Sequence, residues 1–157
     1  MPRHLGHSDG HERHDSHPWV TAVPDRPVPV TDDPDTGGFF QAAGRGALAV
    51  QFCVACARAL HLPRPYCSAC GSWEVEWRDV PPRGRVYSWA VVEQQVHPAF
   101  PVPYTVILVE LDDPPGIRLI GNLPGRPAVR IGDAVRAIFN RSGAEPVIPQ
   151  WTLAEVK

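Results

Sequence analysis

Four cysteines in two closely spaced pairs constrain this chain more than any other feature. The pairs are Cys53-Val54-Ala55-Cys56 and Cys67-Ser68-Ala69-Cys70, and no cysteine lies outside them. A tight turn within a C-x2-C pair directs both sulfurs at one point, so two such turns bring four thiolates to one tetrahedral metal ion. The spacing therefore predicts a metal site rather than two disulfides or buried free thiols.

A site with four protein thiolates is closed, because no coordination position is left for water or substrate. We expect Zn²⁺ bound by Cys53, Cys56, Cys67 and Cys70 to be structural, with its binding energy contributing to the folding of a short segment. His61 lies between the pairs but is not needed as a ligand, and we interpret it as a loop or core histidine. Iron in the same cage, as in a rubredoxin-like electron carrier, is the alternative that thiolate ligands alone do not decide.

The residues on either side of the cysteines predict a zinc ribbon. A β-type run, 49–52, leads into the first pair, and the alternating run Trp73-Glu74-Val75-Glu76-Trp77 leaves the second. Gly71 follows the second pair, where a turn often requires a positive φ. Trp73 and Trp77 share one face of the second run, and we expect them to cover the metal site or the junction with the next domain.

Changes in composition, together with stretches rich in proline and glycine, divide the chain of 157 residues into four parts. Nineteen prolines favour short elements and little helix. We predict a disordered His/Pro-rich tail at 1–36, a short helix plus the zinc ribbon at 37–79, a β-barrel at 80–141 and a C-terminal tail at 142–157. The apolar runs are too short to span a membrane, no apolar signal core begins the chain, and metal-type cysteine usage fits the cytoplasm.

Beyond residue 80 the pattern is that of a β-sheet, so the predicted fold class is mainly β. Strands are expected at 85–92, 104–111, 117–122 and 134–140. Short strands at near-regular spacing suit a small closed barrel, for which the five-stranded OB-fold is the natural candidate. The nearly continuous apolar centre of 104–111 predicts burial on both faces. Trp151 is expected to anchor the C-terminal tail onto this domain or onto a partner.

The order of several motifs resembles a known family. A short aromatic helix precedes the double C-x2-C ribbon, and a strand with Gly-x-Val-Tyr-Ser follows Glu76-Trp77. Later motifs in the same order are His97-Pro98-x-Phe100, Pro103-Tyr104, Val109-Glu110-Leu111 and Ile131-Gly132-Asp133-x-Val135. Over roughly 37–151 the chain resembles the zinc-ribbon plus OB-fold proteins associated with thiolases and acyl-CoA metabolism.

This resemblance implies an accessory role rather than an independent activity. Members of the family look like non-catalytic subunits of thiolase-type enzymes, and one branch joins a thiolase-like partner to form the aldolase that shortens steroid side chains as CoA thioesters. The resemblance therefore implies a hetero-oligomer with a thiolase-like protein, an acyl-CoA ligand and an isolated chain without turnover.

The residues themselves offer binding groups but no catalytic set. Arginine suits phosphate because its guanidinium presents a fixed fork of donors, and Phe100 with Tyr104 suits an apolar channel for a pantetheine or acyl chain. His97 is a possible general base without a carboxylate or nucleophile nearby in the sequence, so we predict no catalytic residue. The candidate CoA- or substrate-binding residues are Arg85, His97, Phe100, Tyr104, Arg118 and Asn122. A solvated arginine surface and ordinary loop packing are the structural alternatives.

A nucleic-acid-binding zinc-ribbon and OB-fold module is the competing function. Tyr87 and Trp89, together with the arginines, would suit base stacking and backbone contacts. The formal net charge of −2, the sequence pI near 6.4 and the acidic pairs Asp32-Asp33 and Asp112-Asp113 oppose it.

Overall fold

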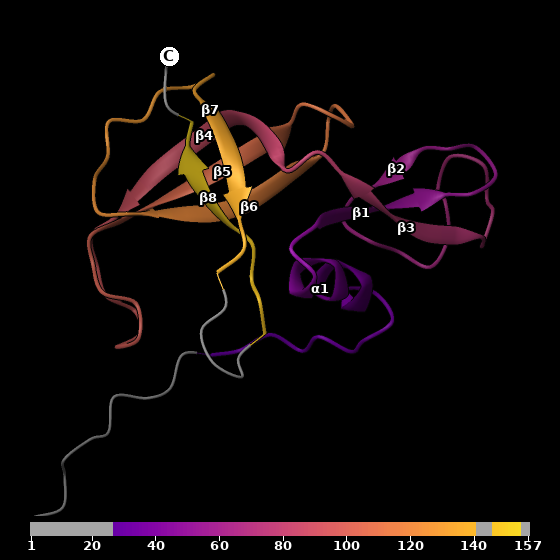
Figure 1. Ribbon diagram of the computed structural model, residues 1–157, viewed down its shortest axis with the longest axis horizontal. Coiled ribbons are helices and arrows are strands. Elements are labelled where there is room, and N and C mark those ends of the chain that lie inside the picture. Colours follow the sequence, from indigo (N-terminus) through magenta and orange to yellow (C-terminus); the bar gives the residue numbers. More distant parts are fainter. Residues whose placement is uncertain (1–26, 141–145, 155–157) are drawn as a thin grey trace, which may run out of the picture.

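The computed structural model describes residues 27–140 and 146–154, and the predicted N-terminal tail lies largely outside them. Within these residues the chain forms one helix, α1 (Gly37–Gly44), and two antiparallel sheets, so the mainly β prediction is confirmed (Figure 1). The smaller sheet has the order β2-β1-β3, and the larger has the order β6-β5-β4-β7-β8. Among the described residues, no helix has the length and apolar character needed to cross a bilayer.

The smaller sheet carries the cysteines. Its central strand is β1 (Leu48–Cys53), which pairs with β2 (Ala59–Leu60) on one side and with β3 (Val75–Val80) on the other. The register with β3 places Cys53 opposite Val75. Both cysteine turns therefore lie at the same end of the sheet, as the ribbon prediction requires.

The larger sheet contains the strands predicted after residue 80 together with one more. Its strands are β4 (Arg83–Val92), β5 (Tyr104–Leu111), β6 (Arg118–Pro124), β7 (Ala134–Ile138) and β8 (Gln150–Leu153). Residues 150–153 belong to the predicted C-terminal tail, 142–157, but in the structure they pair with β7 as a fifth strand. The anchor prediction for Trp151 is confirmed, since its side chain is only 3% exposed in the core.

The two edges of this sheet meet through side chains. Within the described residues, the hydrogen-bonded order ends at β6 and β8, so the predicted fully closed barrel is not formed by the ladder. Instead, the Trp151 indole of β8 lies directly on Gly121 of β6, where a Cβ atom would overlap the ring. The absence of a side chain at Gly121 thus lets the curled sheet close by packing.

A continuous apolar core joins the ribbon to the larger sheet. Leu48 and Val50 of β1 belong to the same buried cluster as Val86, Ile107 and Val109, and Phe39 of α1 packs against it. Burial along β5 alternates strictly, with every second residue buried and the others only partly covered. The prediction that β5 is buried on both faces is therefore wrong, because its outer face carries no second layer within the described residues.

Helix α1 is held against the ribbon by a close contact between Gly38 and the Trp77 indole. A Cβ at Gly38 would overlap the ring, whereas a Cβ at Gly44 in the same helix meets nothing within 4 Å. Trp77 therefore lies between the helix and the ribbon, a contact that the sequence did not predict.

Gly38→Ala should lower the free energy of unfolding by about 1–3 kcal/mol, because the helix and the indole must separate to admit the methyl group. Gly44→Ala is the matched control and should leave stability unchanged or slightly raised, since alanine favours the helix. Urea unfolding of the purified variants measures both. Equal stability of the two variants would show that the contact does not hold the helix.

Candidate functional site

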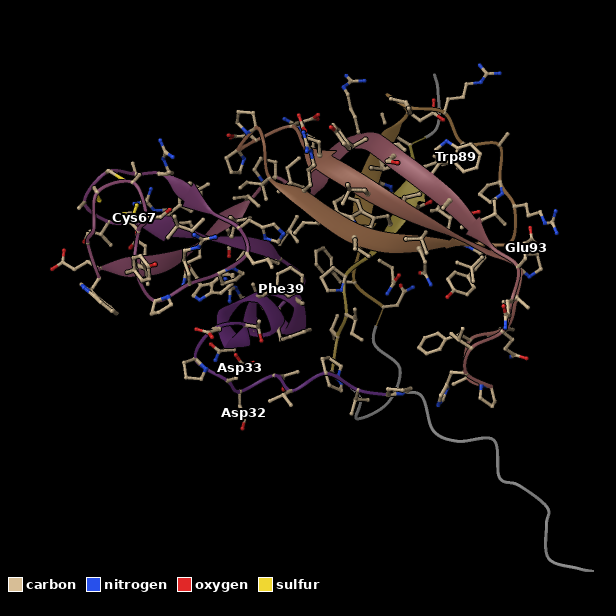
Figure 2. All side chains as sticks on the ribbon, turned by 180° about the vertical axis from the view of Figure 1, so that it is seen from behind. Asp32, Asp33, Phe39, Cys67, Trp89 and Glu93 are labelled. Atoms are coloured by element: carbon tan, nitrogen blue, oxygen red, sulfur yellow. The ribbon has the colours of Figure 1, made fainter. Side chains whose placement is uncertain are left out.

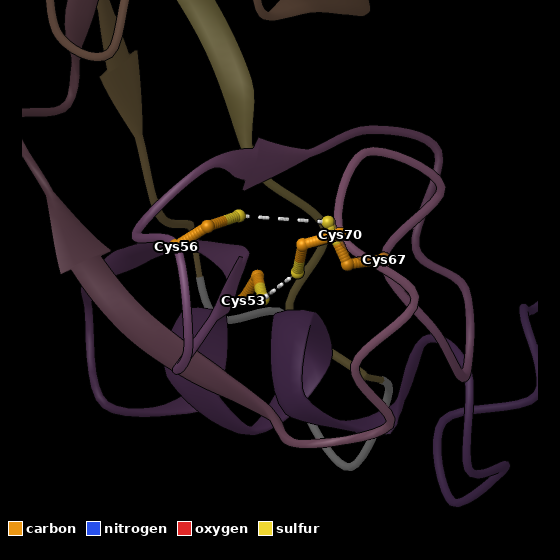
Figure 3. Close-up of side chains that lie close together, drawn as sticks. All are labelled: Cys53, Cys56, Cys67 and Cys70. Carbon is orange, nitrogen blue, oxygen red and sulfur yellow. Dashed lines mark hydrogen bonds between the residues drawn. The ribbon is translucent and has the colours of Figure 1, made fainter.

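Four sulfur atoms meet at the end of the ribbon. All four Sγ atoms lie within 4.8 Å of one another, and none is in a disulfide (Figure 3). The Sγ atoms of Cys53 and Cys70 are 3.6 Å apart, and those of Cys56 and Cys67 are 3.7 Å apart. Tetrahedral zinc with Zn–S bonds of about 2.3 Å places its sulfurs about 3.8 Å apart. The cage therefore fits a structural zinc ion, as predicted from the spacing.

The two cysteine turns share one backbone design. The N–H of Ala57 donates to the carbonyl oxygen of Cys53 at 2.9 Å, and the N–H of Gly71 donates to that of Cys67 at 2.8 Å. Both residues stand four positions after the first cysteine of their pair, and both have positive φ, 59° at Ala57 and 76° at Gly71. The predicted turn conformation at Gly71 is confirmed, and alanine adopts the same conformation in the first turn.

The charges in the cage explain why it needs a cation. Backbone N–H groups of Ala69 and Cys70 lower the pKa of the Cys67 thiol to about 6. The N–H of Ser72 also stabilises the Cys70 thiolate, but the three neighbouring sulfurs outweigh it and raise the pKa of Cys70 to about 12. Four thiolates so close together repel one another, and a bound divalent cation removes that repulsion.

The surroundings of the cage differ in part from the prediction. Trp73 is 72% exposed, and its ring centroid lies 5.5 Å from that of Tyr66, so it forms an aromatic pair on the ribbon surface instead of covering the junction. His61 lies outside the thiolate cage. Partial burial lowers the pKa of His61, and a hydrogen bond with the backbone of Arg118 in β6 opposes the effect. His61 thus links the ribbon loop to the larger sheet.

A second candidate site is a hollow on the larger sheet. Its volume is about 410 Å³, and it brings together four of the six predicted binding residues: His97, Phe100, Tyr104 and Asn122. None of the four cysteines lines the hollow. Cys67 and Glu93, which begins the loop carrying His97 and Phe100, lie at opposite ends of the molecule (Figure 2). Gln150 of β8 also lines the hollow. Sequence reasoning missed it because it did not predict β8.

The two predicted arginines do not join this group. Arg118 pairs with Glu110, with Nε 2.8 Å from Oε2, and its guanidinium carbon lies 3.5 Å from the centre of the Tyr87 ring. Arg85 Nε lies 3.9 Å from Oδ1 of Asp112. Each guanidinium thus already faces a carboxylate, and neither lines the hollow.

The histidine of the hollow is ordered by its own loop. Nδ1 of His97 accepts a hydrogen bond from the N–H of Ala99 at 3.2 Å, and the ring packs edge-on against Phe100 at 5.8 Å between centroids. Because Nδ1 acts as the acceptor, Nε2 carries the proton. Among the described residues, no carboxylate forms an ion pair with His97. This arrangement supplies a hydrogen-bond donor rather than an acid–base set.

Comparisons with known proteins match the two parts of the structure separately. Residues 40–76 match a model described as the ChsH2 rubredoxin-like zinc ribbon domain, and residues 77–140 match one described as the ChsH2 C-terminal OB-fold domain. A chain of the solved Ltp2–ChsH2(DUF35) aldolase is 35% identical with a TM-score of 0.70, and the match covers 80% of this chain and 97% of that one.

Two further relatives match over a smaller share of their length or with lower identity. A Thermomonospora curvata protein described as a probable enoyl-CoA hydratase alpha subunit is 36% identical over 121 residues, 77% of this chain, but the match spans only 37% of the relative's length. A DUF35 protein of unknown function from Sulfolobus solfataricus is 16% identical with a TM-score of 0.52, covering 76% of this chain and 86% of that one. The latter likeness concerns the fold alone.

The shared turn design generates a matched pair of substitutions. Gly71→Ala should destabilise the zinc-bound ribbon by about 1 kcal/mol, because a Cβ is disfavoured at positive φ, while Ala57→Gly should stabilise it by up to about 1 kcal/mol. Zinc affinity from chelator competition and the thermal midpoint should move in opposite directions for the two variants. Shifts of the same sign would contradict the equivalence of the turns.

Proposed function

This chain belongs to the ChsH2 family of proteins, which combine a rubredoxin-like zinc ribbon with an OB-fold domain, and we propose that it is an accessory subunit of a thiolase-like enzyme acting on acyl-CoA thioesters. The observation that carries the proposal is the 35% identity over 97% of a chain in the solved Ltp2–ChsH2(DUF35) aldolase. The relative described as a probable enoyl-CoA hydratase alpha subunit adds support for CoA thioesters as substrates.

The chemistry of the candidate sites agrees with an accessory role. All four cysteines are gathered in the metal cage, so no thiol among them is left to act as a nucleophile. Nδ1 of His97 accepts from the backbone N–H of Ala99, and the ring has no carboxylate partner among the described residues. The bond-breaking groups are therefore contributed by the partner, for which a retro-aldol cleavage of a steroid side-chain CoA is the reaction we propose.

In this assembly the chain binds or channels the thioester through its hollow. An apolar lining with a few polar groups is typical of small-molecule sites. Phe100 and Tyr104 supply aromatic surface, and His97 and Asn122 supply polar atoms. The zinc ribbon, in contrast, stabilises the fold and contributes to the contact with the partner.

The nucleic-acid alternative has weaker support. A protein that binds a phosphate backbone presents guanidinium and ammonium groups to solvent along one face. Here the guanidinium groups of Arg83, Arg85, Arg118 and Arg126 each lie within 4 Å of a carboxylate oxygen. These pairs reduce the positive field that a nucleic acid would require.

Cys67→Ser should remove zinc, unfold the ribbon and abolish binding to the partner. Structural zinc contributes about 10–16 kcal/mol to the folding of such modules, and Cys67 is fully buried in the cage. Ser68→Ala in the same turn is the control and should retain zinc and partner. The measurement is co-purification with the thiolase-like protein encoded nearest to this chain, together with zinc content. Full complex formation by Cys67→Ser would mean that the ribbon does not organise the interface.

His97→Ala should leave partial activity in the complex, because the histidine binds the ligand but does not break bonds. The rate of acyl-CoA cleavage by the purified complex tests this, with intact complex formation checked by gel filtration. Complete loss of the rate in an intact complex would assign a catalytic role to His97. The isolated wild-type chain should give no turnover, and measurable turnover would overturn the accessory assignment.

A further inference from the structure

Apolar side chains on the rim of the hollow face solvent. Val96 and Ile120 are both largely exposed, and they line the hollow together with Val106 and Ile148. Contiguous exposed apolar surface on a protein usually marks a contact with another chain segment or molecule. Within the part of the chain that the structure describes, no segment covers Val96 or Ile120.

The first described segment of the chain starts at this hollow. Pro27 is one of the lining residues, and residues 27–36, indigo in Figure 1, lead from it to α1. Asp33 fixes the other end of the segment, because its Oδ1 accepts hydrogen bonds from the N–H groups of Asp35 and Thr36 at 2.9 Å each. The residues before Pro27 therefore join the rest of the molecule at the rim of the hollow.

This segment does not itself fill the hollow. Its two valines, Val28 and Val30, are exposed, and neither lines the hollow. An occupant supplied by the adjoining chain must therefore come from residues before Pro27.

The sequence before Pro27 has one apolar run close to the hollow. Trp19-Val20-Thr21-Ala22-Val23 is uncharged, whereas residues 6–18 contain no large apolar side chain. Val23 is four residues from Pro27 and Trp19 is eight, which allows separations of up to about 14 Å and about 29 Å. Both side chains can therefore reach a hollow that Pro27 itself lines.

The lining of the hollow suits this run better than the residues beside it. No Asp, Glu, Lys or Arg lines the hollow, so Asp25 and Arg26 would lose hydration there without gaining an ion pair. An indole buries about 150–250 Å² of surface, and its N–H needs an acceptor. The hollow, with a volume of about 410 Å³, is large enough for one such ring, and Asn122 supplies a polar group among the lining residues.

We propose that residues 19–23 fold back into the hollow of the same chain, with the Trp19 indole as the anchor. A tether of three residues gives an effective concentration in the millimolar range, so a contact with a Kd of about 1 mM between separate molecules would be at least about half formed within one chain. The segment covers the hollow as an internal competitor of the thioester, a consequence that rests on the proposed function.

Fluorine nuclear magnetic resonance of the full chain labelled with 5-fluorotryptophan tests the proposal. The chain has five tryptophans, and Trp19→Phe identifies the Trp19 signal by its loss. The exposed Trp73 and the buried Trp151 are internal references for a dissolved gadolinium chelate, which broadens the signals of accessible rings. Trp19 should be broadened no more than about half as strongly as Trp73. Broadening equal to that of Trp73 would overturn the proposal.

Two isoleucines of nearly equal exposure provide a matched pair of variants. Ile120, 76% exposed, lines the hollow, and Ile131, 75% exposed, lies outside it. Ile120→Asp should increase the broadening of Trp19 about twofold, because a carboxylate disfavours an apolar occupant, while Ile131→Asp should leave it unchanged. Val96→Asp repeats the test on the other side of the rim, and a protected Trp151 signal shows that each variant is folded. Equal broadening of Trp19 in the folded Ile120 and Ile131 variants would contradict the assigned location.

Dilution distinguishes a contact within one chain from a contact between two. Protection within one chain does not depend on protein concentration, so the broadening of Trp19 should stay the same between about 500 and about 50 µM. Loss of protection on dilution would place the segment in the hollow of a second copy and overturn the proposal.

Propionyl-pantetheine separates this proposal from the proposed function. The thioester should displace the segment by mass action and increase the broadening of Trp19 in the full chain. A protected Trp19 on which the thioester has no effect overturns the thioester site in the hollow and leaves the docked segment standing. An exposed Trp19 in a chain whose Asn122 amide resonance still shifts with the thioester overturns the docked segment and leaves the thioester site standing.

Discussion

The convergence of four thiolates at the end of one small sheet is the interaction on which the rest of the structure depends. The segment that carries them is short, and its own buried cluster consists of little more than Cys53, Cys67 and Leu60. Such a segment does not bury enough apolar surface to fold alone, so a metal ion replaces the missing core. The mutual repulsion of the thiolates makes the same point, because a bound divalent cation is what allows all four cysteines to be deprotonated together.

Once the metal ion holds the ribbon together, residues of the ribbon complete the apolar core of the larger sheet. Leu48 and Val50 of β1 lie in the same buried cluster as the strands of the larger sheet, and α1 is held to the ribbon through Gly38 and Trp77. The metal thus supports the larger sheet indirectly. The hollow is lined by residues of both edge strands, β6 and β8, which are held together where Trp151 packs on Gly121.

Features determined by local chemistry were predictable from the sequence. The spacing of the cysteines specified the metal ligands, because a chelating turn requires neighbours in the chain, and β5 was predicted with its observed bounds from its apolar run. Features that depend on pairing between distant strands were not predictable. β8 has four residues with no strong strand pattern, and it forms a strand because it pairs with the free edge of β7.

The candidate ligand residues divide in the same way. Register places Arg85 opposite Glu110 and Glu110 opposite Arg118, so both arginines lie among carboxylates on one sheet face. His97, Phe100, Tyr104 and Asn122 come together only because the loop after β4 approaches β5 and β6. Gln150 carried no signal in the sequence, since it reaches the hollow only through the pairing of β8 with β7.

Titration of the cysteine thiols, with zinc measured in parallel, tests the central claim most directly. We predict that the native chain contains one zinc ion and exposes no reactive thiol, and that a chelator releases the metal, frees four thiols and unfolds the ribbon together. A natively folded chain whose four thiols react freely in the absence of any metal would contradict the account.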